Sequence, residues 1–187
     1  YELAELVPLW DYGEDHGENY SGNYSARFYK KYGDLYNMGE RVWIEFYAKD
    51  HKLHGYSVGN SKCEDNAIKI TKEEAIQIAT NEDRKVESKA IIRTNAELKI
   101  RSMNGNAYAR LNNTEEYYKP MMPNDGAIRE SITYKTDGRI RKVWVVVFEY
   151  SDEGTDIVDK VTKGQYSYFV DATTGEIIGG ETSDSLR

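Results

Sequence analysis

Residues 168–178 constrain the fold of this chain more than any other stretch, because they specify a strand, a tight turn and a second strand. Apolar side chains at 166, 168 and 170 alternate with Ser167 and Phe169, as in a half-buried strand. Gly175 supplies the positive φ that the turn after Asp171 needs, and Asp commonly caps the amides that follow it in such turns. We therefore predict a structural turn at Asp171, Thr174 and Gly175, and no catalytic role for Asp171 with Glu176.

A helix start precedes this turn in the sequence. Thr71 can accept a hydrogen bond at the N-cap, and Glu74, three residues on, can return one to the amide of the cap. Ala75, Ile76 and Ala79 then form a narrow apolar stripe, small enough to lie close against a sheet. The two features together predict antiparallel sheets with a packed helix, and hence an α+β fold.

These two stretches resemble the PepSY family, whose modules run from a helix into antiparallel strands and end in a strand, an Asp-Ala-x-Thr-Gly-Glu turn and a last strand. The residues that match are Ile70, Glu73, Glu74, Ala75 and Ala79 in the helix start, and Asp171, Ala172, Thr174, Gly175 and Glu176 in the turn. The segment at about 95–135 is additional to a compact module of this family. We expect it to be an insertion that carries a β-hairpin at Asn104-Gly105.

A weaker internal similarity indicates a second unit upstream. Residues 42–53 align with residues 166–177 at alternating apolar positions, and residues 24–32 stand where residues 144–150 stand. Self-similarity of this kind is typical of a repeated unit, and chance alignment of amphipathic strands is the alternative. We expect a partial, mainly β PepSY-like unit at 1–66 and a fuller unit at 67–187. Such pairs resemble the YcdB/YcdC-type proteins secreted from Gram-positive bacteria.

The first of these units has no obvious helix. Either that helix lies upstream of the chain, or residues 2–10 are a short helical remnant. Strands are predicted at residues 24–32, 41–48, 53–58, 97–103, 106–111, 128–134 and 140–150, with turns at Gly33 and 37–39 and at 136–138. The strand at 140–150 is apolar on both faces, so we expect it to be central in its sheet.

Charge and composition exclude several functions. The net charge of -7 and scattered basic residues argue against nucleic acid as a partner. No apolar run is long enough for a membrane span, and the single Cys63 cannot form an internal disulfide. The PepSY resemblance implies an extracellular or cell-envelope location. The chain starts at a tyrosine without a signal segment, so we expect the signal or anchor to be missing from it.

The sequence gives only weak evidence for metal-binding or catalytic residues. His51 and His54 have no third ligand at a diagnostic spacing. The oxygen donors Asp11, Asp15, Glu18 and Asn19 miss the calcium-loop pattern, although a weak calcium site there is the alternative to a flexible acidic loop. No hydrolase, phosphate-loop or dinucleotide motif is found. We therefore predict no metal, no cofactor and no enzymatic activity.

Tyrosine is in excess, with sixteen tyrosines against four phenylalanines. Its apolar ring and polar tip favour recognition surfaces, although tyrosines also fill the half-wet faces of open antiparallel sheets. The candidate binding surface consists of Tyr20, Tyr24, Trp43, Tyr117 and Tyr118.

Three functions follow as hypotheses. The first is a non-catalytic, exported protein-binding module, for which the PepSY resemblance implies a secreted peptidase or another cell-envelope protein as partner, regulated or inhibited on binding. An exposed sheet edge could pair with an extended segment of that partner. The second is a cell-wall or carbohydrate binder that uses exposed Tyr and Trp side chains. The third, an enzyme, would need a constellation that no motif indicates.

Overall fold

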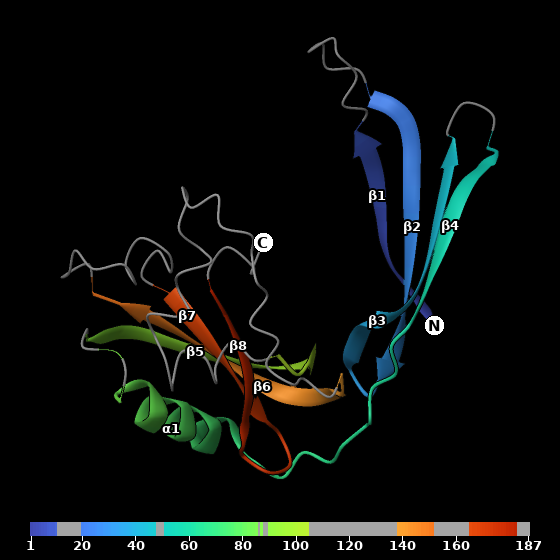
Figure 1. Ribbon diagram of the computed structural model, residues 1–187. Coiled ribbons are helices and arrows are strands. Elements are labelled where there is room, and N and C mark those ends of the chain that lie inside the picture. The colour runs from blue at the N-terminus through green and yellow to red at the C-terminus, as the bar shows by residue number, and fades with distance from the viewer. Residues whose placement is uncertain are drawn as a thin grey trace, which may run out of the picture. The chain divides into compact units, whose positions relative to one another are not determined.

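The computed structural model describes residues 1–10, 20–47, 51–85, 87, 90–104, 138–151 and 165–182. The chain divides into two units, Tyr1–Cys63 and Glu64–Arg187, which we call unit 1 and unit 2. Within the described residues, each unit contains one four-stranded antiparallel sheet, and unit 2 also contains a helix (Figure 1).

Unit 1 is a meander in which each strand pairs with its neighbour in sequence. The strands are β1 (Glu2–Trp10), β2 (Tyr20–Tyr32), β3 (Leu35–Tyr47) and β4 (Leu53–Asn60), in the order β1-β2-β3-β4. Gly33, at a φ of 62°, lies in the tight turn between β2 and β3, where a left-handed conformation favours glycine.

The structure contradicts one of the two alternatives given for the helix of unit 1, and it contradicts one predicted turn. Residues 2–10 form β1 and not a helical remnant. An irregularity between Leu3 and Glu5 places Leu3 and Leu6 on one face of the strand, a spacing of three that imitates a helix. Residues 37–39 lie inside β3 and are not a turn. Asn37 is buried there, and its side-chain amide donates a hydrogen bond of 2.7 Å to the carbonyl oxygen of Ser61.

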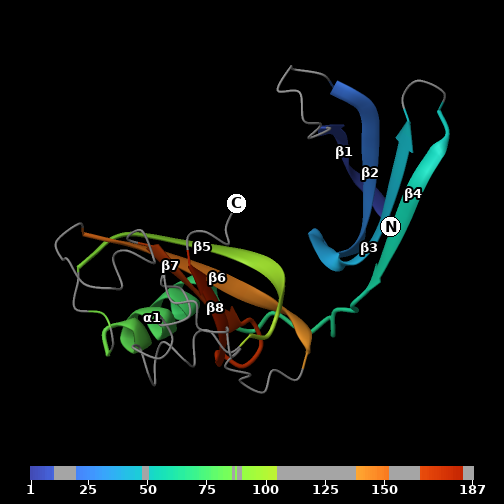
Figure 2. The ribbon, with the colours of Figure 1, turned by 45° about the horizontal axis from the view of Figure 1, so that its top comes forward.

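Unit 2 begins with the helix and continues as a second meander. Its elements are α1 (Lys72–Asp83), β5 (Ile91–Ser102), β6 (Ile140–Tyr150), β7 (Gln165–Asp171) and β8 (Ile177–Thr182), in the sheet order β5-β6-β7-β8. The helix α1 lies against β5, β6 and β7 on one face of this sheet (Figure 2). β6 lies between β5 and β7 and buries residues on both faces, which confirms the prediction of a central strand.

The start of α1 is the predicted capping box. The Glu74 amide donates to the Thr71 hydroxyl over 3.2 Å, and the Thr71 amide donates to the Glu74 carboxylate over 2.8 Å. Ala75 and Ala79 are fully buried against the sheet, because side chains of this size let the helix approach closely.

The α+β assignment is wrong. Within the described residues the protein is mostly β, with eight strands and one helix of 12 residues. The capping box and alanine stripe are strong local signals for a helix, but they hold for one short segment only. The strand ladders, which need partners distant in sequence, make up most of the described structure.

The two sheets share more than their strand order. In unit 1 a register shift lies between Glu45 and Phe46, and in unit 2 one lies between Phe169 and Val170. Four directly opposed pairs of unit 1 each have a counterpart at the same ladder position in unit 2. The pairs of unit 1 are Leu6–Ala26, Tyr24–Phe46, Phe28–Val42 and Phe46–Leu53. Their counterparts in unit 2, in the same order, are Ala96–Val146, Trp144–Val170, Phe148–Tyr166 and Val170–Ile177. The aligned positions within 24–28 and 42–53 therefore occupy equivalent places in the two ladders. The irregularities at Leu3 and Glu5 and at Tyr29 and Lys30 of unit 1 have no counterpart at the same positions in unit 2.

The described part of the expected insertion belongs to the sheet of unit 2. Residues 95–102 form the last eight residues of β5 and pair with β6. The predicted strands at 106–111 and 128–134, and most of the segment to residue 135, lie outside the described residues.

Candidate interaction face

One face of the sheet β1–β4 is apolar on all four strands. Directly opposed residues of an antiparallel pair point to the same side, and side chains alternate between faces along each strand. On this rule Ala26 shares a face with Leu6 of β1 and Ile44 of β3, and Ile44 shares it with Tyr56 of β4. We call this surface the open face; its residues are Leu3, Leu6, Tyr24, Ala26, Phe28, Val42, Ile44, Phe46, Leu53, Tyr56 and Val58.

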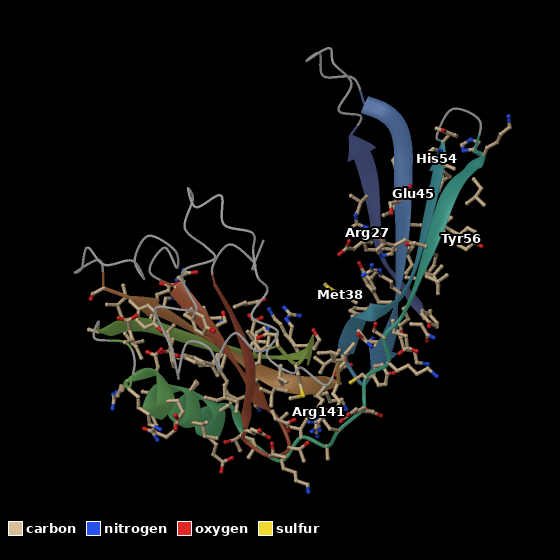
Figure 3. All side chains as sticks on the ribbon, viewed as in Figure 1. Arg27, Met38, Glu45, His54, Tyr56 and Arg141 are labelled. Atoms are coloured by element: carbon tan, nitrogen blue, oxygen red, sulfur yellow. The ribbon has the colours of Figure 1, made fainter. Side chains whose placement is uncertain are left out.

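Large apolar side chains of the open face are accessible to solvent. Leu6 is 60% exposed, Val58 is 62% exposed, and Tyr56, whose side chain projects from β4 in Figure 3, is 73% exposed. No described helix or strand of unit 1 packs on this face. Antiparallel sheets usually bury one face against a core, and a contiguous exposed apolar patch marks an interaction site.

The centre of the open face is ordered by contacts between strands. The rings of Tyr24 and Phe46 are stacked, with 5.8 Å between their centroids and 21° between their planes. These two residues are directly opposed in the ladder. A stacked pair held by the backbone offers a fixed apolar surface, so little side-chain entropy is lost when a partner covers it.

The other face of the same sheet is charged. Arg27 forms an ion pair of 3.0 Å with Glu5. The guanidinium groups of Arg27 and Arg41 lie 4.9 and 4.2 Å from the ring centroid of Trp43. The sheet therefore has one apolar face and one face on which charged side chains surround Trp43 and the buried Tyr29.

The equivalent face in unit 2 is a core. Val146, Phe148, Tyr166 and Tyr168 occupy the ladder positions of Ala26, Phe28, Val42 and Ile44, and all four are fully buried. They pack with Ala75 and Ala79 of α1. The equivalent surface is thus covered by a helix in unit 2, whereas no described element of unit 1 covers it in the first sheet.

The predicted binding residues are not brought together. Tyr24 lies in the open face and Trp43 on the charged face, because they occupy alternate ladder positions. The side chain of Tyr20 and the whole of Tyr117 and Tyr118 lie outside the described residues. Leu6, Ile44 and Val58 of the open face were not among the predicted binding residues. The signal was the alternation of apolar residues at 24, 26 and 28, at 42, 44 and 46, and at 56 and 58, which Trp43 interrupts.

The predicted turn residues have structural contacts. The Asp171 carboxylate accepts hydrogen bonds of 2.8 and 3.0 Å from the amides of Thr173 and Thr174. Gly175, at a φ of 76°, donates its amide to the Asp171 carbonyl over 3.0 Å. The second carboxylate oxygen of Asp171 lies 3.0 Å from Nε of Arg141, an ion pair whose angles do not meet those of a hydrogen bond.

Within the described residues, no group of three or more His, Cys, Asp or Glu side chains is arranged to hold a metal ion. The ring of His54 packs against Tyr47, with 4.6 Å between the centroids. The candidate calcium donors Asp11, Asp15, Glu18 and Asn19 lie outside this part of the chain. The one helix that the structure describes is neither long enough nor apolar enough to cross a membrane.

No family model matches the sequence, and no curated protein does. Among solved structures, the Bacillus megaterium YpeB C-terminal domain is a structural neighbour, with 14% sequence identity and a TM-score of 0.33. The alignment covers 96% of this chain and 55% of that chain, so this chain spans about half the length of its neighbour. A similarity of this size carries no argument about function.

Proposed function

We propose that this chain is a non-catalytic protein-binding module and that the open face of β1–β4 is its binding surface. The observation that carries the proposal is the contiguous apolar surface across four strands, with Leu6, Tyr56 and Val58 largely exposed. Covering one such side chain contributes about 1.5–3 kcal/mol. Several are needed together, because association itself costs an estimated 4 kcal/mol or more in lost freedom.

The partner class comes from the sequence resemblance. Residues 70–79 and 168–178 resemble the PepSY family, and the shared register of the two sheets supports tandem units of one kind. On this basis the chain is an exported protein, and its partner is a secreted peptidase or another cell-envelope protein whose activity changes on binding. We infer that contact is made through the open face rather than through a sheet edge.

Carbohydrate binding has less support. Sugars stack on accessible aromatic faces, but the ring of Trp43 is already contacted by Arg27 and Arg41. Tyr24 is stacked on Phe46. Tyr56 is the aromatic side chain of the open face that is most accessible, and its neighbours Ile44 and Val58 are aliphatic.

Two variants on the same strand test the proposal. Tyr56 and Ser57 are adjacent on β4, are both exposed, and point to opposite faces of the sheet. Tyr56→Glu places a charge in the open face, and Ser57→Glu places the same charge on the charged face. The whole chain and both variants are immobilised and exposed to the culture medium and envelope fraction of the source organism, and retained proteins are identified by mass spectrometry.

We expect a secreted peptidase or envelope protein to be retained by the native chain and by Ser57→Glu, and to be lost with Tyr56→Glu. A retained peptidase should also change its activity with the dose of the native chain. Equal retention by both variants would place binding elsewhere, and retention of wall polysaccharide alone would contradict protein binding. Circular dichroism of the variants checks that the sheet is intact.

A further inference from the structure

We infer that the outer edge of β4 pairs with the same edge of a second copy of this chain, so that two four-stranded sheets join into one antiparallel sheet. This dimer does not depend on the proposed function, because it uses backbone groups at the edge of the sheet, whereas the open face is a surface of side chains. Three observations carry the inference: the direction of the backbone groups of β4, the equivalent edge in unit 2, and the residues of β4 that would oppose each other.

Alternate residues of β4 direct their backbone groups away from β3. The amide of Ser61 donates to the carbonyl oxygen of Gly39 over 3.0 Å, and these two residues are directly opposed when the register of the β3–β4 ladder is continued. Hydrogen-bonded and non-hydrogen-bonded pairs alternate along an antiparallel ladder. Counted from this pair, Tyr56 and Val58 are not hydrogen-bonded to β3, so their N–H and C=O groups lie at the outer edge.

The equivalent edge in unit 2 is closed by a side chain. Gly180 of β8 has the ladder position of Tyr56. Its amide donates to the side-chain oxygen of Asn104, and its carbonyl oxygen accepts from the side-chain amide of Asn104, both over 3.0 Å. Asn104 thus takes the place of an added strand on β8. Within the described residues, no strand pairs with the outer edge of β4.

The sequence of β4 contains nothing that would repel a second copy. Natural edge strands carry charged residues or proline, which discourage pairing with another chain. The edge strand β1 contains Glu2, Glu5 and Pro8, and the edge strands β5 and β8 also contain charged residues. From Leu53 to Asn60, β4 contains no Asp, Glu, Lys, Arg or Pro. Among the edge strands of the two described sheets, β4 alone therefore lacks these barriers.

A two-fold axis at Ser57 opposes residues that fit. In an antiparallel pair centred there, Ser57 faces itself, and Tyr56 of each copy faces Val58 of the other. Tyr56 and Val58 are 73% and 62% exposed, and an aromatic residue opposite a β-branched one is a favourable cross-strand pair. Each such pair exchanges two backbone hydrogen bonds. Directly opposed residues point to the same side, so the two open faces form one continuous surface.

Two substitutions of Ser57 test this register. Because Ser57 faces itself across the axis, Ser57→Glu places two carboxylates opposite each other, and Ser57→Lys places two ammonium groups there. Sedimentation velocity over a concentration series gives the dimer dissociation constant of the native chain, of each variant and of an equimolar mixture of the variants. We expect the native chain to dimerise, each variant alone to dimerise about five-fold more weakly at low salt, and the mixture to regain the native affinity.

Val58→Pro tests the edge itself. Proline has no N–H, and an edge strand tolerates it where that N–H faces outward. Each copy loses one hydrogen bond to the other, so we expect the dimer to weaken at least about ten-fold, while the thermal midpoint changes little. Val58→Thr keeps the N–H and a β-branched side chain. It is the matched control and should dimerise like the native chain.

Leu6→Glu distinguishes pairing at the edge from stacking of two open faces. Leu6 lies in the open face on β1, the edge strand opposite to β4, so this change should leave the dimer intact. A native chain that stays monomeric at the highest concentration would overturn the inference. So would a dimer that Leu6→Glu breaks and Val58→Pro does not, or a mixture of the two Ser57 variants that dimerises no better than either alone.

The same variants separate the dimer from the proposed function. Ser57→Glu should weaken the dimer and retain the captured protein, because the open face of each copy stays complete. Leu6→Glu should keep the dimer and lose the captured protein. A monomeric native chain that captures a partner through Tyr56 would overturn the dimer alone, and a dimer that captures no protein would overturn the proposed function alone.

Discussion

The carboxylate of Asp83, in the last turn of α1, accepts a hydrogen bond of 2.7 Å from the hydroxyl of Tyr168 at the centre of the second sheet. The same oxygen accepts a bond of equal length from Tyr150. Both tyrosines and the aspartate are buried. Hydrogen bonds to a charged group are stronger than neutral ones, so this contact fixes where the helix ends on the sheet.

Replacing Asp83 by Asn should destabilise unit 2 by about 1.5–3 kcal/mol, the usual worth of hydrogen bonds to a charged group. The free energy of unfolding is measured in urea from the fluorescence of Trp144, in a background with Trp10→Phe and Trp43→Phe. Glu82→Gln is the matched control, because Glu82 forms an ion pair with the exposed Lys85, and it should change stability by less than about 1 kcal/mol. Equal effects of the two changes would contradict the role of Asp83.

Comparing alanine variants at two glycines of unit 2 distinguishes the cost of a left-handed backbone from the cost of a steric contact. Gly175 and Gly138 have φ values of 76° and 70°, so alanine should cost about 1 kcal/mol at each position through the left-handed backbone alone. A Cβ at Gly175 would also lie 3.0 Å from Cδ1 of Ile78, whereas one at Gly138 would meet nothing within 4 Å. Gly175→Ala should therefore lower the thermal midpoint more than Gly138→Ala. The reverse order would show that the turn is not packed on α1.

Because Asp171 and Arg141 form an ion pair, we expect a variant changed at both residues to regain stability that the Asp171 variant loses. Asp171 is fully buried and the Arg141 side chain is 16% exposed. Asp171→Asn removes one charge of a buried pair, which typically costs about 3–5 kcal/mol. We expect a smaller loss of stability here, because Glu64 lies 3.3 Å from Arg141 and still pairs with it. Adding Arg141→Met should restore part of the lost stability in urea denaturation. Additive losses would mean that the two side chains do not interact.

We expect the free energy of unfolding to fall at alkaline pH because of Tyr32. Its hydroxyl donates a hydrogen bond of 2.6 Å to Glu40, and this bond raises the pKa of Tyr32 to about 12. An unfolded tyrosine ionises near pH 10. The folded protein therefore holds the proton more tightly, and the resulting stability is complete below about pH 10 and lost as the pH rises to about 12.

Comparing the native chain with Tyr32→Phe isolates this contribution. The difference between their free energies of unfolding, measured in urea from pH 8 to pH 12, should be largest at the low end and shrink above pH 10. A difference that is constant across this range would show that Tyr32 titrates alike in the folded and unfolded states.

Local patterns predicted local structure correctly. The pair Thr71 and Glu74 identified the start of α1, because a capping box depends only on residues within one turn. The apolar residues on both faces of 140–150 identified β6 as a central strand. In both cases the neighbours that determine the structure are close in sequence or are implied by the composition of the strand itself.

Other features depend on partners that a sequence pattern does not specify. The strand β1 was not predicted because a bulge near Leu3 breaks its alternation, and its position depends on pairing with β2. The open face was not predicted because the excess of tyrosines pointed to an aromatic surface, whereas most residues of the open face are aliphatic. The strand alternation shows which residues share a face, but only the structure shows that a helix covers that face in one sheet and no described element of unit 1 covers it in the other.

The strand order of each sheet also bears on how the chain folds. Every strand pairs with its neighbour in sequence, and sheets built from such short-range contacts form quickly. In unit 2, however, residues 103–139 separate β5 from β6, so that pairing carries a larger loop-closure entropy. In unit 1 the longest gap between paired strands, residues 11–19, is much shorter, so we expect its sheet to form before the sheet of unit 2. The apolar surface of unit 1 would then be exposed while unit 2 is still unfolded, and such exposure favours aggregation.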